Sequence, residues 1–283
     1  MNIDFRFLEI PTKSCTRDDL ITFMADDEIA KRINFATTHH NSLRKTEQEG
    51  GLITLPFVDS IEPILKNKLG NDKKLFISKY GGVWRGIHSN EEYSRFEEFI
   101  KEYNQIVFLR DNLELSLALS MNIIDEERTE TGELEYLAKF QNDDEAKDEL
   151  VNICEEWLKK LPFYQYADYI CAMPSSNKNS LPQRIVEQLS GFDFENISDS
   201  VFWSSKTRSI KNAATIEEKL EILDESGLTI SDDLNLNGKT VLLFDDLYMS
   251  GLSMQYVAMK LKEAGAIRIF GLSIVKSRSN TAQ

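Results

Sequence analysis

Residues 239–253 of this chain read KTVLLFDDLYMSGLS. The apolar run 241–244 enters a turn that contains a glycine and two serines, and such a run predicts a buried strand. Apolar residues then recur at positions 254, 257, 258 and 261, which is the spacing of the apolar stripe of a helix. Another strand-like run follows at 267–275. The stretch therefore predicts a strand, a loop, a helix and a second strand, which is the βαβ unit of a parallel sheet.

The loop of this unit is the place where a ligand would bind. Open α/β sheets bind ligands at the carboxyl ends of their strands. Two adjacent carboxylates, Asp245 and Asp246, suit sugar hydroxyls, which need acceptors. The helix start after Gly251 offers backbone N–H groups to an anion, and Ser250 and Ser253 add hydroxyl donors. Together these features predict a site for a phosphorylated sugar.

The stretch resembles the phosphoribosyl-pyrophosphate (PRPP) motif of type I phosphoribosyltransferases. That motif has four apolar residues, two acids, two variable residues, Thr-Thr-Gly and a further Thr. Asp245, Asp246, Ser250, Gly251 and Ser253 match it, with serine in place of threonine, while Met249 departs from it. The resemblance implies that the two acids hold the ribose 2′ and 3′ hydroxyls and that the loop holds the 5′-phosphate. It assigns PRPP binding to Tyr248, Met249, Ser250, Gly251, Leu252 and Ser253.

The acid pair is also compatible with other kinds of site. A Walker B strand also ends in acids, but it needs a P-loop. The only Gly-Lys-Thr is residues 238–240, and position 233, where the P-loop requires glycine, is an aspartate. A receiver-type acid pair would normally lie near the start of its domain. The plain alternative stays open, namely that Asp245 and Asp246 only turn the chain and cap a helix.

A second strand, predicted at 167–173, ends in a loop that begins Pro174-Ser175-Ser176-Asn177-Lys178. The chain from about residue 133 loosely resembles ComF-like competence proteins, in which the loop after this strand contacts pyrophosphate. An ordinary strand-to-helix turn is the alternative. The resemblance assigns pyrophosphate binding to Pro174, Ser175, Ser176, Lys178 and Lys211.

The window 204–212 is the most basic in an acidic protein. It lies where type I enzymes have a mobile loop that closes over PRPP, excludes water and supplies cations to the leaving group. The resemblance implies catalytic roles for Lys206 and Arg208 beside Asp245 and Asp246. The alternative is a solvent-exposed basic loop. ComF-like proteins are also linked to nucleic-acid processing, but alternating cations do not by themselves show nucleic-acid binding.

Composition limits the class of protein. The chain has 283 residues, 41% hydrophobic and 28% charged, with a net charge of −14, which favours solubility and disfavours nonspecific binding of nucleic acid. No apolar stretch has the length of a membrane span, and the N-terminus lacks the features of a signal peptide, so we expect a cytoplasmic protein. Three scattered cysteines indicate reduced thiols. The adjacent His39 and His40 point in different directions, so no metal site of the protein's own is predicted.

The expected architecture is α/β, with a phosphoribosyltransferase-like parallel sheet flanked by helices over residues 126–283. Residues 1–125 are expected to form a smaller α/β or α+β domain of unknown role. Residues 111–149 are predicted to be a charged connector. The segment Lys79–Gly86, with three glycines and Trp84, is either a stacking or phosphate-contacting loop or a tight turn with a packed tryptophan.

Three functional hypotheses follow. The first is a PRPP-dependent phosphoribosyltransferase that uses Mg²⁺, transfers phosphoribose to an unidentified acceptor and releases pyrophosphate. The second is a regulator that binds PRPP or a nucleotide without catalysis, in a DNA-processing or defence context. The third is an assembly subunit with a vestigial pocket. A protein partner of the N-terminal domain, a nucleic-acid partner and a homo-oligomer are further expectations, and no membrane association is expected.

Overall fold

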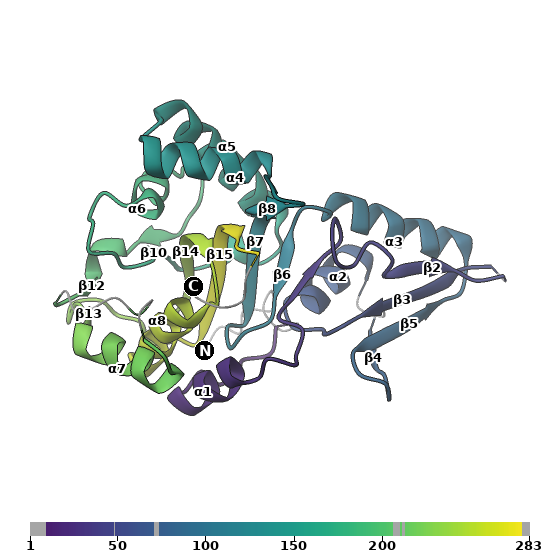
Figure 1. Ribbon diagram of the computed structural model, residues 1–283, viewed down its shortest axis with the longest axis horizontal. Helices are drawn as coiled ribbons and strands as arrows, with labels where there is room; N and C mark the ends of the chain where they lie inside the picture. The colour runs from purple at the N-terminus through teal and green to yellow at the C-terminus, as the bar shows by residue number, and fades with distance from the viewer. Residues whose placement is uncertain (1–9, 48, 71–73, 206–209, 211–212, 279–283) are drawn as a thin grey trace.

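The computed structural model describes residues 10–47, 49–70, 74–205, 210 and 213–278. Two large sheets, each with its own helices, make up most of this part of the chain (Figure 1). The larger sheet has seven strands in the order β1-β6-β7-β15-β14-β10-β11, and the smaller sheet has four in the order β2-β3-β5-β4. The larger sheet lies to the left in Figure 1 and the smaller one to the right, so the molecule is elongated.

The larger sheet is parallel over five of its strands, from β7 through β15, β14 and β10 to β11, while β6 and β1 extend it in antiparallel pairing. This confirms the predicted α/β class, with a mainly parallel sheet flanked by helices. Its strands are β1 (Arg32–Asn34), β6 (Val107–Leu109), β7 (Leu115–Met121), β10 (Tyr169–Ala172), β11 (Glu195–Asn196), β14 (Thr240–Tyr248) and β15 (Arg268–Lys276).

Helices cover both faces of this sheet (Figure 1). Alternate residues of β14 belong to two separate cores, Leu242 and Phe244 to one and Val241 and Leu243 to the other, as expected for a strand that is buried on both sides. The first face packs against α4 (Glu130–Tyr136), α5 (Asp144–Lys160) and α6 (Leu181–Val186), and the second against α1 (Arg17–Ala25), α7 (Ile216–Ser226) and α8 (Leu252–Glu263).

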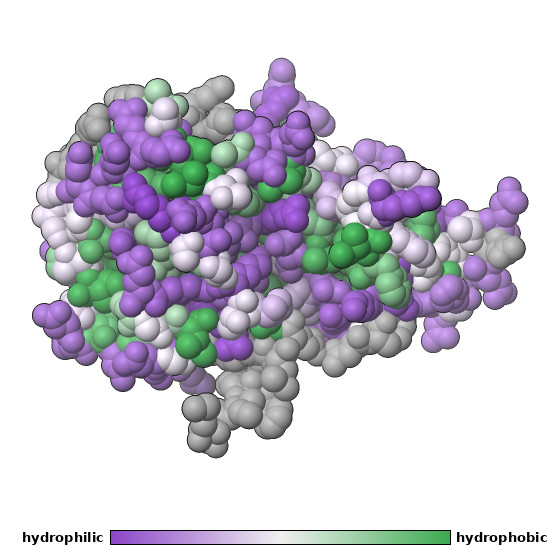
Figure 2. All heavy atoms as spheres, turned by 90° about the horizontal axis from the view of Figure 1, so that it is seen from below, coloured by the Kyte–Doolittle hydropathy of each residue, from purple (hydrophilic) through white to green (hydrophobic). Residues whose placement is uncertain are grey.

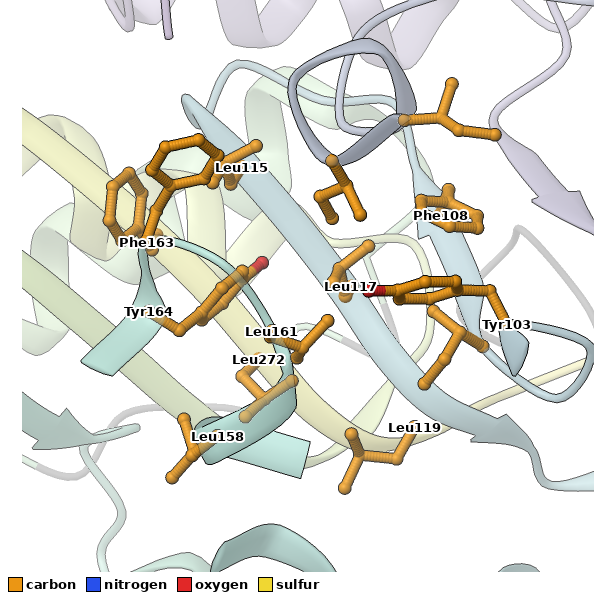
Figure 3. Packing of buried hydrophobic residues seen from close by; sticks show 14 of the residues in the cluster. Tyr103, Phe108, Leu115, Leu117, Leu119, Leu158, Leu161, Phe163, Tyr164 and Leu272 are labelled. Atoms are coloured by element: carbon orange, nitrogen blue, oxygen red, sulfur yellow. The ribbon is translucent and has the colours of Figure 1, made fainter. Parts of the chain in front are cut away.

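The prediction of a charged connector over residues 111–149 is wrong for its first part, because residues 115–121 form the buried strand β7. All seven of its residues are buried, since its two polar members are small serines and no charged residue lies within it. Figure 3 shows how β7 and its neighbours build one core from Tyr103, Phe108, Leu115, Leu117, Leu119, Leu158, Leu161, Phe163, Tyr164 and Leu272.

The larger sheet takes three strands, β1, β6 and β7, from the residues before 126. The first part of the chain therefore completes the sheet in addition to forming the smaller one. A division into two domains at residue 125 stays a prediction.

The smaller sheet is antiparallel and is covered on one face. In β3, Ile53 and Leu55 are buried against the helices, while Leu52 and Thr54 face the other way. Ser89 caps the helix that begins at Asn90, because its hydroxyl accepts a hydrogen bond from the backbone N–H of Glu92. The elements are β2 (Leu43–Lys45), β3 (Gly51–Leu55), α2 (Ile61–Leu69), β4 (Phe76–Ile77), β5 (Val83–Ile87) and α3 (Asn90–Glu102).

Short elements connect these units. Two further two-stranded sheets are β8 (Ile123–Ile124) with β9 (Glu127–Arg128) and β12 (Val201–Trp203) with β13 (Leu228–Ile230). A five-residue π-helix, Leu137–Gln141, joins α4 to α5, and two 3₁₀ turns lie at Tyr164–Tyr166 and Ser198–Ser200.

Figure 2 shows that the face seen from below is mostly hydrophilic, with separate apolar patches. This agrees with the net charge of −14. Among the described helices, none combines the length and apolar character that crossing a bilayer requires.

Candidate functional site

The candidate site lies at the edge of the larger sheet where the parallel pairing of β10 with β14 ends. Ala172 pairs with Phe244, and the backbone N–H of Met173 then donates to the carbonyl of Phe244 at 2.7 Å. Asp245 and Asp246 follow directly on β14, while Pro174 follows on β10. A cavity of about 390 Å³ opens at this edge, which we call the strand-end pocket. Its position is the one where parallel α/β sheets bind ligands.

Five residues assigned from the sequence line the strand-end pocket, namely Pro174, Ser175, Asp245, Asp246 and Ser253. They come from the ends of two strands and the first turn of α8. The structure thus brings the acid pair and the start of α8 to the same cavity as the loop after β10.

The acid pair is held by a lysine that the sequence analysis did not select. Lys139 Nζ lies 2.9 Å from Asp246 Oδ2 and 3.4 Å from Glu135 Oε1. Asp246 in turn donates its backbone N–H to Asp245 Oδ1 at 2.9 Å. The Asp246 side chain is only 13% exposed and that of Glu135 only 4%. Three carboxylates and one ammonium group therefore form a compact, largely buried cluster beside the pocket.

Burial and mutual repulsion shift the titration of this cluster. Burial, and then the neighbouring Asp246 carboxylate, raise the pKa of Asp245 well above its ordinary value. Burial likewise raises the pKa of Glu135, against the opposing effect of Lys139. Burial alone would lower the pKa of Lys139, but the Asp246, Glu135 and Asp245 carboxylates together raise it. Lys139 thus stays a cation at neutral pH, whereas Asp245 and Glu135 take up protons more readily than exposed carboxyl groups do.

Lys139 lies in the π-helix Leu137–Gln141, and π-helical turns are frequent at functional sites. The turn ends at Asn142, whose φ of 54° is left-handed. Arg184 of α6 donates from Nη2 to the carbonyl of Ala138 at 2.7 Å and so ties α6 to the same turn. Arg184 and Asn142 also line the strand-end pocket. Two cations, Lys139 and Arg184, therefore line the same cavity as the acid pair.

No pattern in the sequence identifies these cations. Lys139 and Arg184 look like ordinary polar residues of amphipathic helices, and Lys139 is 107 positions away from Asp246 along the chain. Only the packing of α6 against β14 and β10, and of α4 against β15 and β7, brings them to the acids.

The turn between β14 and α8 requires glycine at its last position. Gly251 has a φ of 81°, and a Cβ there would lie 2.0 Å from Tyr248 Oη. The Ser250 hydroxyl accepts a long hydrogen bond (3.4 Å) from the backbone of Leu252, whose side chain is buried in the core. Met249 is half-buried. The predicted loop is thus a tight turn that places the first N–H groups of α8 beside Ser253.

Tyr248 lies inside β14, because the strand continues past the acid pair and Tyr248 pairs with Lys276 of β15. Its side chain is buried, and its hydroxyl donates to Asp111 Oδ2 at 2.9 Å. Any contact of Tyr248 with a ligand in the strand-end pocket would therefore come from its backbone. The assignment of Tyr248 to PRPP binding stays a prediction.

The loop after β10 continues away from the acids. Ser176 and Lys178 line an adjoining cavity of about 430 Å³, which shares Pro174 and Ser175 with the strand-end pocket. Trp203 Nε1 donates to the carbonyl of Pro174 at 3.0 Å and holds the start of the loop in place. The basic residues assigned from the sequence, Lys206, Arg208 and Lys211, lie outside the described residues.

The described residues include no group of three or more His, Cys, Asp and Glu side chains arranged to hold a metal ion. Mg²⁺ in sites for phosphorylated ligands takes one or two carboxylates from the protein and the remaining oxygens from ligand and water. Asp245 and Asp246 beside an open cavity fit an ion of that kind, which would arrive with its ligand.

Searches for relatives give limited matches. No family model and no curated protein matches this chain. Among solved structures, a hypoxanthine phosphoribosyltransferase from Staphylococcus aureus is 13% identical in each of two crystal forms. The alignment covers 48% of this chain and 68% of that chain at a TM-score of 0.32 (tetragonal), or 48% and 69% at 0.31 (orthorhombic). A hypoxanthine-guanine-xanthine phosphoribosyltransferase is 16% identical, with 46% and 63% covered at a TM-score of 0.28. At these identities and TM-scores the likeness does not bear on the activity of this chain.

Proposed function

We propose that the strand-end pocket binds PRPP and that the chain is a phosphoribosyltransferase, which transfers phosphoribose to an acceptor and releases pyrophosphate. One observation carries the proposal. The acid pair, the first turn of α8 and the loop after β10 lie around one cavity at the carboxyl edge of the parallel sheet. These are the three elements that the sequence resemblance assigns to ribose, 5′-phosphate and pyrophosphate.

Each part of the pocket suits one part of that ligand. Asp245 and Asp246 would accept hydrogen bonds from ribose hydroxyls. The backbone N–H groups at the start of α8, with the hydroxyls of Ser250 and Ser253, would hold the 5′-phosphate. Met249 supplies no hydroxyl there. On the other side of the cavity, Ser175 and the backbone after Pro174 face the space for the pyrophosphate group.

The cations of the pocket explain how bond cleavage would be assisted. Breaking the bond between the ribose and pyrophosphate leaves negative charge on the leaving group and positive charge on the ribose. Lys139 and Arg184, which both line the cavity, would stabilise the negative charge on the leaving group. The two aspartates would stabilise the positive charge on the ribose. Mg²⁺ bound to PRPP would neutralise part of the phosphate charge. Lys178, Lys206, Arg208 and Lys211 would supply further positive charge by the sequence assignment.

A second function is favoured by one feature of the cluster. Asp246 is already paired with Lys139 at 2.9 Å, so a ribose hydroxyl would share this carboxylate with an ammonium group. A pocket of this kind suits a regulator that binds PRPP or a nucleotide without turning it over. An assembly subunit with a vestigial pocket is the remaining hypothesis. The acceptor, a protein partner of residues 1–125 and a homo-oligomer stay predictions.

The proposal is tested by calorimetric titration of PRPP with Mg²⁺, with pyrophosphate release followed in parallel. The variant Asp245→Asn/Asp246→Asn keeps the size of both side chains and removes their charge. The chain contains its own control, because Asp232-Asp233-Leu234 repeats the sequence Asp-Asp-Leu on an exposed loop. Asp232→Asn/Asp233→Asn removes the same charge from the molecule but leaves the pocket unchanged.

We expect saturable binding in the wild type and in the Asp232/Asp233 variant, and none in the Asp245/Asp246 variant. Pyrophosphate release at the same site establishes the transferase, whereas binding without release establishes the regulator. Absence of PRPP binding in folded wild type would refute both and leave the assembly hypothesis.

A further inference from the structure

A second cavity lies on the smaller sheet, away from the strand-end pocket. Four of the eight exposed large apolar side chains of the described residues fall within residues 76–84, namely Phe76, Ile77, Tyr80 and Trp84. Clusters of exposed apolar side chains often mark interaction sites or ligand-binding grooves. The segment includes the Gly-Gly-Val-Trp stretch, for which the sequence predicts either a stacking loop or a tight turn.

The strand register explains why Trp84 faces outward. The buried residues Val83 and Ile87 of β5 point toward the helices, so Trp84 points to the uncovered face. Thr54 lies opposite it on β3, and Phe76 lies opposite it on β4. The Phe76 and Trp84 ring centroids are 5.9 Å apart, with the ring planes inclined by 44°. Trp84 is 41% exposed, so much of its ring is available for a flat ligand.

The glycine turn before Trp84 is a structural requirement. Gly82 has a φ of +70°, and a Cβ there would lie 2.6 Å from the carbonyl oxygen of Leu55. The turn therefore packs closely against the end of β3 and fixes the start of β5. The turn is tight, as one alternative predicted, but its tryptophan is exposed and lines a cavity, and a stacking or phosphate-contacting role stays a prediction.

Residues 28–30 and 38–42 border this face and enclose a cavity of about 670 Å³, which we call the aromatic pocket. Its volume is in the range of pockets for small ligands. It shares no lining residue with the strand-end pocket. Its walls include Trp84, His39, His40, Arg44, Arg110 and Glu28.

Hydrogen bonds fix the tautomers of the two histidines. The backbone N–H of Asn34 donates to Nδ1 of His39 at 3.3 Å, so the proton of this ring is on Nε2. Nδ1 of His40 donates to the carbonyl of Thr37 at 2.8 Å, which leaves its Nε2 as an acceptor in the neutral ring. Burial lowers the pKa of His39 and keeps it neutral near pH 7. His39 thus offers the pocket an imidazole N–H donor.

The charge around the aromatic pocket suits an anion. Residues 36–88 contain eight Lys and Arg against five Asp and Glu, in a chain with a net charge of −14. No ion pair within the described residues involves Arg44, whose Nε donates to the carbonyl of Asn41 at 3.3 Å. Arg110 is paired with Asp59 at 3.2 Å. Glu28 is the single acid among the described residues that line this cavity.

We propose that the aromatic pocket binds a nucleobase that carries a phosphate group, with the base stacked on Trp84, its polar edge near His39 and His40, and the phosphate near Arg44. A planar ring on an exposed tryptophan, polar contacts to the base edge and an arginine for the phosphate are the usual components of such a site. The base belongs either to a free nucleotide or to an unpaired residue of single-stranded nucleic acid.

The experiment is equilibrium binding of AMP, GMP, CMP and UMP and of a fluorescent single-stranded oligothymidylate of about eight residues, each to the full chain. Trp84→Ala should weaken binding roughly 5- to 100-fold, while Trp84→Phe keeps a stacking ring and should retain it. Tyr166→Ala, at another aromatic residue of similar exposure (40%), is the matched control. Adenosine, titrated in the same way, lacks the phosphate, and Arg44→Gln should abolish the preference of the protein for AMP over adenosine.

The same titrations on the variant Asp245→Asn/Asp246→Asn show which of the two pockets binds the nucleotide. If it is the aromatic pocket, the affinity for nucleotide should be retained in this variant. Similar affinity for nucleotide and oligonucleotide indicates a free nucleotide, and tighter oligonucleotide binding indicates a single strand. Both outcomes support stacking on Trp84. The proposal is overturned if no probe binds, if Trp84→Ala binds like the wild type, or if loss of the acid pair abolishes binding.

Discussion

The strand-end pocket and the aromatic pocket belong to sheets that are covered in different ways. Helices pack on both faces of the larger, mainly parallel sheet, so its polar side chains reach a ligand only where the strands end. The smaller antiparallel sheet has helices on one face, and its other face is free to carry exposed aromatic residues. The way each sheet is covered therefore decides where on it a binding site can form.

The same difference sets how each site depends on the stability of the fold. At the strand ends, Lys139, Glu135 and Asp246 are partly or fully buried and are bound to one another. In the aromatic pocket, Trp84 and Arg44 are exposed. Substitutions at the strand ends should alter folding and binding together, whereas substitutions in the aromatic pocket should alter binding alone.

The largest effect on stability is expected for Lys139→Met. Removal of the ammonium group leaves the buried carboxylates of Glu135 and Asp246 without their cation, which should cost about 3–5 kcal/mol in the free energy of unfolding. Lys159→Met is the matched control, since Lys159 also pairs with a glutamate four residues earlier, at 3.5 Å, but is 57% exposed. It should cost less than about 1 kcal/mol. Urea denaturation at pH 7 measures both.

The pH dependence of the stability of Lys139→Met tests whether buried carboxylates cause the loss. Without Lys139, which opposes the effect of burial, the folded-state pKa of Glu135 should rise further above its unfolded value. The folded state then binds more protons than the unfolded state, so the stability deficit of the variant should grow as pH rises from about 4 toward neutrality. Equal losses for the Lys139 and Lys159 variants would contradict the account of a buried cluster.

Lys276, at the end of β15, is expected to give the next largest effect. Burial, and then the nearby Arg32, lower its pKa from 10.5 to about 7. The unfolded chain therefore binds more protons above pH 7, and this residue should make stability rise with pH by at most about 1.4 kcal/mol per unit up to the unfolded pKa. Lys276→Met should remove that rise and be more stable than the wild type at pH 7.

Thermal unfolding between pH 7 and 9 makes this measurement, and Lys101→Met on the exposed face of α3 is the control. The control should leave the slope against pH unchanged. If stability rises with pH as steeply in the Lys276 variant as in the wild type, burial does not lower the pKa of Lys276 in the way described.

The sequence predicted the parts of the strand-end pocket that local patterns encode. The run Val241–Phe244 indicated a buried strand, and the periodic apolar residues after Gly251 indicated α8. The residues of the acid pair and of the loop after β10 do meet at one cavity. Their meeting follows from parallel neighbours ending at the same edge, which is a general property of such sheets.

The remaining features depend on contacts between distant segments. Lys139 meets Asp246 only because a π-helical turn packs over the end of β14. Tyr248 does not line the strand-end pocket, because β14 continues to pair with β15 past the acid pair. Strand β7 was missed because its apolar run is interrupted by two serines, Ser116 and Ser120, which are both buried.

Tyr248→Phe should have a smaller effect on stability. It removes the hydroxyl that donates to the buried Asp111, which should cost about 1–3 kcal/mol. Tyr169→Phe is the control, because the Tyr169 hydroxyl bonds the carbonyl of Asn235 at an exposed position and its loss should cost less. Since the Tyr248 hydroxyl is bound to Asp111, PRPP affinity should stay unchanged. A large loss of PRPP affinity would show that the side chain reaches the ligand.

The smallest effect on stability is expected for Trp84→Ala, the substitution that should weaken nucleotide binding most. With 41% of the side chain exposed, its removal should change the free energy of unfolding by less than about 1 kcal/mol. Phe96→Ala, at a fully buried ring of α3 under the same sheet, should cost about 3–5 kcal/mol. Urea denaturation of the two variants compares the covered and the uncovered face of one sheet. If Trp84→Ala is as costly as Phe96→Ala, the tryptophan is part of the core, and the contrast between the two pockets does not hold. If it is nearly neutral, a large aromatic residue stays exposed without a folding role, and ligand binding is the remaining physical reason for its place there.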